Sequence, residues 1–291
     1  MPSVVPDQAA GLRRLFARSV VRSVTFVSGS RGVGRTALVA NLAVALARRG
    51  QNVCVLDSHD GAGSAAEQMG MRRPRDLAEV IRHDTPLDDL LLSGPEGIRL
   101  VRAVQGRRML GDLDAVAEDR LRNAFMSLQP AVDFLLVDAQ GEAVDTAASA
   151  AVASTEIVVV TSAGADGITH AYGLMKRLSR EAGRRRFHVI VCRARAADHA
   201  QAVFENLEST ARRFLSVSVT GLGWIPEDAD LARASRLRQS VVCAFPESVS
   251  AAALGRVADT LIHWPYAGED GLDGFVHRLV QASRTSPSAT A

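Results

Sequence analysis

The sequence contains little cysteine and almost no lysine. Its three cysteines, Cys54, Cys192 and Cys243, stand singly inside apolar stretches. No two of them have the spacing of a metal or redox site, and an odd number argues against a disulfide framework. We therefore expect buried, reduced thiols in a cytosolic protein. Lys176 is the only lysine, so arginine carries almost all of the positive charge.

An excess of one charge sign and a long apolar run are also missing. The formal net charge is +2 at pH 7, so composition forces no broad basic surface for nucleic acid. No apolar run is long enough to cross a bilayer. Asp7, Arg13 and Arg14 interrupt the amino terminus, which argues against a signal peptide. These absences predict a cytoplasmic protein, and 291 residues of ordinary globular composition allow one large domain.

Short β-branched apolar runs recur along the chain and are bounded by turn residues. The runs are Ser23–Ser28, Asn52–Asp57, Phe134–Asp138, Glu156–Thr161, Phe187–Arg193 and Leu222–Ile225. Such runs are typical of parallel strands that are covered on both faces. Between the first two, Thr36–Arg49 has helical apolar spacing and stops at Gly50. This alternation predicts an α/β fold with a doubly wound, mostly parallel sheet and helices on both faces.

The chain divides into one large domain and shorter flanking segments. We expect the domain to span residues 21–265, preceded by a segment at 1–20 and followed by a helix within 266–284 and a disordered tail at 285–291. The helix is amphipathic, because apolar residues recur there at helical spacing. These residues are Leu272, Phe275, Val276, Leu279 and Val280. The pattern fits a helix that binds a membrane surface and equally one that packs on the domain.

A glycine-rich loop joins the first strand to the first helix. Gly29 to Thr36 reads Gly-Ser-Arg-Gly-Val-Gly-Arg-Thr. In a P-loop, glycines let backbone N–H groups wrap phosphates, and the hydroxyl after the basic residue holds Mg²⁺. The dipole of the following helix favours the same anion. Arg35 stands where the P-loop pattern has lysine.

Two aspartates end predicted strands close to this loop. Asp57 and Asp138 occupy the positions where P-loop NTPases place acids that organise the metal or the attacking water. The sequence therefore predicts Arg35, Asp57 and Asp138 as catalytic residues. Thr36 joins the two aspartates as a predicted Mg²⁺ ligand.

The wider pattern resembles the MinD/ParA family of ATPases. Ser28–Thr36, followed by Asn41-Leu-Ala and Val55-Leu-Asp57, is similar to the deviant Walker A region of that family. Ile225–Asp228, with Arg233, Arg236 and Phe245–Ser248, is similar to its carboxyl-terminal part. Asp7–Arg13 matches the DQAxxLR signature that precedes the ATPase core in flagellar regulators of the FlhG/FleN type.

The resemblance implies a MinD-like regulator of flagellar number and placement that binds ATP or ADP with Mg²⁺. The implied nucleotide-binding residues are Gly29, Ser30, Arg31, Gly32, Val33, Gly34, Arg35, Thr36, Ala37, Cys192, Arg193, Pro226 and Glu227.

Partners are implied as well. They are an FlhF-type GTPase, flagellar basal-body or transcription-regulator proteins, and a second copy of the chain in a nucleotide-dependent homodimer. The residues implied in partner docking are Asp7, Gln8, Leu12 and Arg13. The carboxyl-terminal helix corresponds to the membrane-targeting helix of the family, which implies a peripheral position on the inner membrane or at a cell pole.

The sequence departs from the family pattern in its nucleotide site. Ser30 replaces a signature lysine that reaches the partner subunit's nucleotide, and Arg31 stands where glycine is usual. His59, in Asp57-Ser-His-Asp60, replaces an aspartate that positions the attacking water. Cys192 replaces an asparagine that reads the adenine edge.

These departures predict a nucleotide site that binds but hydrolyses slowly or not at all. A serine supplies no charge to the transferring phosphoryl group, where electrostatic stabilisation is most of catalysis. The planar fork of Arg35 keeps the charge of lysine without its compact shape. Whether the protein is an enzyme stays open at this stage.

Two other functions fit the same residues. One is a pseudo-ATPase scaffold that binds the same partners without a nucleotide cycle. The other is a ParA-like partition ATPase that contacts DNA through Arg184–Arg186 and Arg212–Arg213. The DQAxxLR match and the near-neutral net charge count against DNA.

Overall fold

The computed structural model describes residues 21–59, 62–72, 75–129, 131–139, 150–265 and 271–285. The predicted docking segment at Asp7–Arg13, Asp60 and the end of the tail lie outside these ranges.

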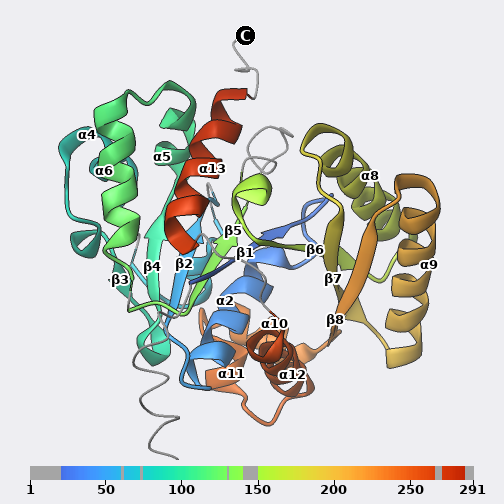
Figure 1. Cartoon of the computed structure of the whole chain (residues 1–291). Helices are drawn as coiled ribbons and strands as arrows, with labels where there is room; N and C mark the ends of the chain where they lie inside the picture. Colours follow the sequence, from blue (N-terminus) through green and yellow to red (C-terminus); the bar gives the residue numbers. More distant parts are fainter. Residues whose placement is uncertain are drawn as a thin grey trace, which may run out of the picture.

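A single eight-stranded sheet organises the described part of the chain (Figure 1). Its order is β3-β4-β2-β5-β1-β6-β7-β8, and every pair is parallel except β3 with β4. The strands are β1 (Arg22–Val27), β2 (Val53–Asp57), β3 (Leu92–Ser93), β4 (Arg99–Arg102), β5 (Phe134–Asp138), β6 (Glu156–Ser162), β7 (Arg186–Ala194) and β8 (Ser218–Pro226). The predicted doubly wound α/β fold is confirmed.

The strand predictions fail only at the margins of the sheet. β4 has arginine at both ends around a two-residue apolar centre, and β3 has only two residues, so neither shows a strand pattern. β8 begins four residues earlier than the apolar run Leu222–Ile225, because its first half alternates between buried and exposed residues. Edge strands are less completely covered than central ones, which weakens their apolar signal.

Helices cover both faces of the sheet and enclose two hydrophobic cores. One face carries α2 (Arg35–Ala47), α3 (Ala65–Gln68), α10 (Ala229–Arg236), α11 (Val241–Ala244) and α12 (Val249–His263). The other carries α4 (Ala78–His83), α5 (Val104–Met109), α6 (Ala115–Met126), α8 (Ala165–Glu181), α9 (Ala197–Leu215) and α13 (Gly271–Thr285). The short 3₁₀ helices are η1 (Leu87–Asp89), η2 (Pro95–Gly97) and η3 (Leu110–Asp112).

The carboxyl ends of the central strands meet at one edge of the sheet. The register pairs Asp138 with Phe26 of β1 on one side and with Asp57 of β2 on the other. The chain leaves β1 at this edge, and strand order diverges from β1 in both directions. Such a switch point is where open α/β sheets bind ligands.

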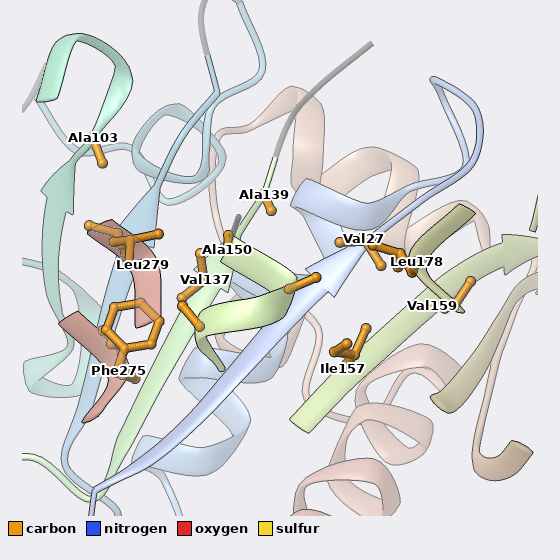
Figure 2. Close-up of a cluster of buried hydrophobic side chains, with 14 of the residues drawn as sticks. Val27, Ala103, Val137, Ala139, Ala150, Ile157, Val159, Leu178, Phe275 and Leu279 are labelled. Carbon is orange, nitrogen blue, oxygen red and sulfur yellow. The ribbon is translucent and has the colours of Figure 1, made fainter. Parts of the chain in front are cut away.

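The carboxyl-terminal helix α13 packs on the domain. Phe275 and Leu279 point into the same buried cluster as Val137 of β5 (Figure 2). The ring of Phe275 lies 5.9 Å from that of Phe125 on α6, and Arg278 Nε donates to the carbonyl of Ala153 at 3.0 Å.

This packing covers all five apolar residues that were predicted to face a membrane. Leu272, Phe275, Val276, Leu279 and Val280 are at most 5% exposed. In the structure, α13 is therefore packed on the domain, and contact with a bilayer would require this helix to leave the domain. Within the described ranges, no helix is both long and apolar enough to cross a membrane.

Candidate nucleotide site

The glycine loop has the backbone geometry that a phosphate cradle requires. Gly32 and Gly34 have φ of 75° and 95°, in the left-handed region that favours glycine. Gly34 is the N-cap of α2, so the free N–H groups of the first helical turn open onto the loop. A Cβ on Gly29 would lie 2.1 Å from the carbonyl oxygen of His170, so only glycine lets the loop pack against α8.

A cavity of about 620 Å³ lies beside this loop. It gathers seven of the predicted nucleotide-binding residues from three parts of the chain. They are Val33, Gly34, Ala37, Cys192, Arg193, Pro226 and Glu227. The other predicted contacts do not line it: Gly29, Ser30, Arg31, Gly32, Arg35 and Thr36. The cavity thus adjoins the end of the phosphate loop.

Sequence reasoning missed the back wall of this cavity. Leu38, Asn41, Ile225, Asp228, Ala229, Leu231, Ala232, Ser235 and Leu254 also line it. Asn41 is held in place, because its Oδ1 accepts from Ser240 Oγ at 2.8 Å and from Val241 N at 2.7 Å. This links α2 to the start of α11. The presence of Asn41 in an otherwise apolar helix was the sequence feature from which this role could have been predicted.

An irregularity in β7 shapes the rim of the cavity. The register with β8 shifts between Cys192 and Ala194, and Arg193 between them has φ of 59°. Such bulges often re-aim side chains near binding sites. Burial raises the pKa of the Cys192 thiol to about 12, so this group is neutral at physiological pH.

The guanidinium group of Arg35 is held by two side chains at the end of the sheet. Its Nε donates to Asp138 Oδ1 at 2.5 Å, and its Nη1 donates to Ser28 Oγ at 3.2 Å. The Arg35 side chain is 10% exposed and that of Asp138 is fully buried. The predicted phosphate-binding cation and the predicted metal-organising acid therefore neutralise each other across the end of the sheet.

Asp57 is held by the backbone that follows it. Its Oδ1 accepts from the N–H of His59 at 2.9 Å, and its Oδ2 accepts from the N–H of Ala65 at 2.8 Å. Burial, and then the charge of Asp138, raise the pKa of Asp57 to about 7. The carboxyl group therefore exchanges its proton near neutral pH, unlike an ordinary aspartate.

His59 turns toward the loop hydroxyl. Its Nε2 lies 3.1 Å from the carbonyl oxygen of Ala62, which assigns the proton to that nitrogen. Nδ1 lies 3.5 Å from Thr36 Oγ1. An imidazole ring has no carboxylate oxygen, so His59 cannot act as the fixed carboxylate of the family.

Some of the residues at this site are suited to hold a Mg²⁺ ion. Asp138 Oδ2 is buried and has no hydrogen-bond partner among the described residues, as expected of an oxygen kept for a ligand. Thr36 and Asp138 would hold the ion together with phosphate oxygens. The ion would neutralise phosphate charge. Asp57 would be a further acidic group near the ion, with its side chain held in place by two backbone hydrogen bonds.

The doubly wound sheet and the glycine loop at its switch point define a P-loop nucleotide-binding protein. A family model described as the CobQ/CobB/MinD/ParA nucleotide binding domain matches residues 24–241. The chain belongs to this family.

Two curated relatives indicate which kind of family member the chain resembles. The chain is 33% identical over 276 residues to the antiactivator FleN of Pseudomonas aeruginosa, covering 94% of this chain and 99% of FleN. It is 23% identical to the flagellum site-determining protein YlxH of Helicobacter pylori, covering 89% of each. The resemblance to flagellar regulators of the FlhG/FleN type is thereby confirmed.

The fold is shared with solved MinD structures. The septum site-determining protein MinD of Pyrococcus horikoshii, complexed with Mg-ADP, matches with a TM-score of 0.64 at 22% identity, covering 84% of this chain and 96% of that one.

Proposed function

We propose that this protein is a nucleotide-responsive switch that regulates the number and placement of flagella. Its likeness to FleN spans almost the full length of both chains, and the relatives FleN and YlxH are an antiactivator and a flagellum site-determining protein by name. The phosphate loop and the adjoining cavity supply the nucleotide site. The switch acts through an FlhF-type GTPase, docked by Asp7, Gln8, Leu12 and Arg13, and through flagellar basal-body or transcription partners.

The likeness to FleN over almost the full length of both chains is the observation that carries this proposal, and the ion pair between Arg35 and Asp138 is the contact that bound nucleotide would have to change. Nucleotide binding in the P-loop manner would require Arg35 to turn from Asp138 toward phosphate, and a Mg²⁺ ion held by Thr36 and Asp138 would supply further positive charge there. Separating a buried pair without replacement costs several kcal/mol, of order 3–5. Bound Mg-nucleotide would offset this cost, so binding would be coupled to a rearrangement at the start of α2 and the end of β5.

The same ion pair favours the pseudo-ATPase as a second candidate. If Arg35 stays with Asp138, no cation faces the transferring phosphoryl group, since Ser30 supplies none. His59 likewise gives no fixed carboxylate to orient water. The protein would then bind its partners through the same surfaces without a nucleotide cycle.

The structure offers little support for the partition-ATPase alternative. Arg184 Nη2 donates to the carbonyl oxygens of Ala151 and Ser154, each at 2.6 Å, and so caps the end of a helix. Arg185 donates to Ser179 Oγ at 3.1 Å. Two of the five arginines proposed to contact DNA therefore make hydrogen bonds inside the fold.

Calorimetry with Mg-ATP and Mg-ADP separates the two leading candidates. The switch predicts saturable binding with a Kd of roughly micromolar order, and turnover well below about 1 s⁻¹. Thr36→Val is the matched variant, because it removes the predicted metal hydroxyl and keeps the shape of the side chain. It should weaken Mg-ATP binding and leave binding of metal-free ATP unchanged. Absence of heat with either nucleotide would favour the pseudo-ATPase.

The flagellar role is tested in the organism that carries the gene. Deletion should change the number or position of flagella seen by electron microscopy, and the intact gene should restore the original pattern. A chain with Arg13→Ala should fail to restore it and still bind nucleotide in vitro. Cells with unchanged flagella after deletion would contradict the proposal.

A further inference from the structure

The strand β8 forms an open edge of the sheet. It pairs with β7 on one side, and within the described ranges no strand pairs with its other side (Figure 1). Its sequence, Ser-Val-Thr-Gly-Leu-Gly-Trp-Ile-Pro, contains no charged residue. Edge strands are usually protected by charges, by interior proline or by brevity. The nine residues of β8 carry only a register shift near Gly223, whose φ is 137°.

Backbone groups of β8 are directed outward at this edge. Ser218 donates its N–H to the carbonyl of Arg185, at the start of β7, at 2.8 Å. Because successive residues of a strand direct their backbone groups to opposite sides, Val219 and Gly221 direct theirs to the open edge. These groups can pair with another extended chain.

A trough runs beside this edge, between β8 and α9. Its volume is about 520 Å³, and its apolar lining includes Val189, Val191, Phe204 and Trp224. Gly221 keeps it open, since a Cβ there would lie 3.3 Å from the ring of Phe204. A strand added to β8 would place alternate side chains on the α9 face of the sheet, where this trough lies.

Asp198 is the charged residue among those that line the trough. Asp198 lines it and is exposed, and Glu205 and Glu208 continue along α9. Gln201 also lines the trough and donates to Glu205 Oε1 at 2.8 Å, and Glu208 pairs with Arg212. Asp198 therefore remains the carboxylate best placed to meet a basic group. The β8 strand of a second copy contains no basic residue that could meet Asp198, so charge complementarity favours a partner segment of different, basic sequence.

We propose that β8 and this trough bind an extended segment of a partner protein. The segment adds as a strand to the open edge, places alternate apolar side chains in the trough and directs a basic residue to Asp198. In this recognition mode backbone hydrogen bonds supply affinity and side-chain pockets supply specificity. The site is separate from the nucleotide cavity and does not depend on nucleotide binding.

Peptide selection on the full-length chain tests the site. A phage-displayed library of random peptides is selected against the protein, and enriched peptides are synthesised for fluorescence anisotropy. The expected peptides alternate apolar and other residues and include lysine or arginine. Two variants probe the site: Ala197→Trp fills the trough from an exposed position, and Asp198→Lys reverses the charge at its mouth. Glu181→Lys, at the exposed end of α8, is the matched charge control.

The proposal expects each trough variant to lose about tenfold or more in affinity, equal to about 1.4 kcal/mol, with Glu181→Lys unchanged. Bound peptide should also slow amide hydrogen exchange at Val219 and Gly221. Asp198→Asn provides a second readout, without charge reversal, if the lysine variant folds poorly. Enrichment of no peptide, binding that Ala197→Trp leaves intact, or concentration-dependent self-association through β8 would overturn the proposal.

Discussion

At the scale of single residues, the orientation of Arg35 decides what the nucleotide site can do. Its fork reaches Asp138 through Nε and Ser28 through Nη1 at the same time. A lysine has one compact ammonium group and cannot hold both partners in this geometry. The departure from the P-loop pattern therefore changes the resting state of the site as well as its affinity for phosphate.

Arg35→Lys should increase affinity for Mg-ATP by about tenfold, because the ammonium leaves Asp138 more readily and fits the β- and γ-phosphates. Calorimetry of the variant beside the parent measures this. Ser28→Ala is the control, since it removes only the second partner of Arg35 and should give a smaller gain. Equal or weaker binding by Arg35→Lys would mean that arginine already serves the phosphates.

Asp57 should make the stability of the nucleotide-free protein depend on pH. Its pKa is about 7 in the folded chain, against an ordinary value of 3.8. The native state therefore keeps a proton that the unfolded chain has lost, and stability falls as pH rises between these two values. At about 1.4 kcal/mol per pKa unit, the loss is at most about 4 kcal/mol.

Urea unfolding across this pH range, without Mg²⁺ or nucleotide, measures the effect. Asp57→Asn keeps the shape of the side chain and removes the titration, so its stability should change less over the same range. A parent protein that becomes more stable as pH rises would show that another group dominates.

At the scale of elements, α13 stabilises the domain in the conformation seen here. Phe275→Ala should lower the free energy of unfolding by about 3–5 kcal/mol, the usual cost of truncating a buried phenylalanine. His277→Ala, on the exposed side of the same helix, should change it by less than about 0.5 kcal/mol. Chemical unfolding of both variants checks this.

Vesicle flotation complements that measurement. With α13 packed, the nucleotide-free protein should not float with vesicles of anionic lipid. Flotation that Phe275→Ala abolishes, with unfolding free energy unchanged, would show that the helix serves the membrane and not the domain.

At the scale of the whole molecule, Ser30 bears on self-association. The family's signature lysine reaches the nucleotide of the partner subunit, and a hydroxyl cannot supply that charge. Ser30→Lys should therefore strengthen Mg-ATP-dependent dimerisation by at least about tenfold. Sedimentation velocity with and without Mg-ATP measures this. Ser30→Gln is the matched uncharged control, and equal gains from both variants would exclude a role for charge.

Much of this architecture was readable from local patterns in the sequence. The central strands are buried on both faces, so their apolar runs stand out, and glycines mark the phosphate loop because its backbone needs positive φ. The positions of Asp57 and Asp138 at strand ends followed from the same runs. Strands β3 and β4 could not be predicted, because short strands at the margin of a sheet bury too few residues to produce an apolar pattern.

Tertiary structure alone decided which distant groups meet. Arg35 and Asp138 are 103 positions apart, and their pairing follows from the adjacency of β1 and β5, which local periodicity does not encode. The sequence also left open which surface α13 contacts, because a single apolar stripe can face either a bilayer or a protein core. The sequence by itself determined the strands, the loop and the family likeness, since these depend on local periodicity and backbone conformation. Where Arg35 points, what α13 covers and what closes the nucleotide cavity depend on contacts between remote segments.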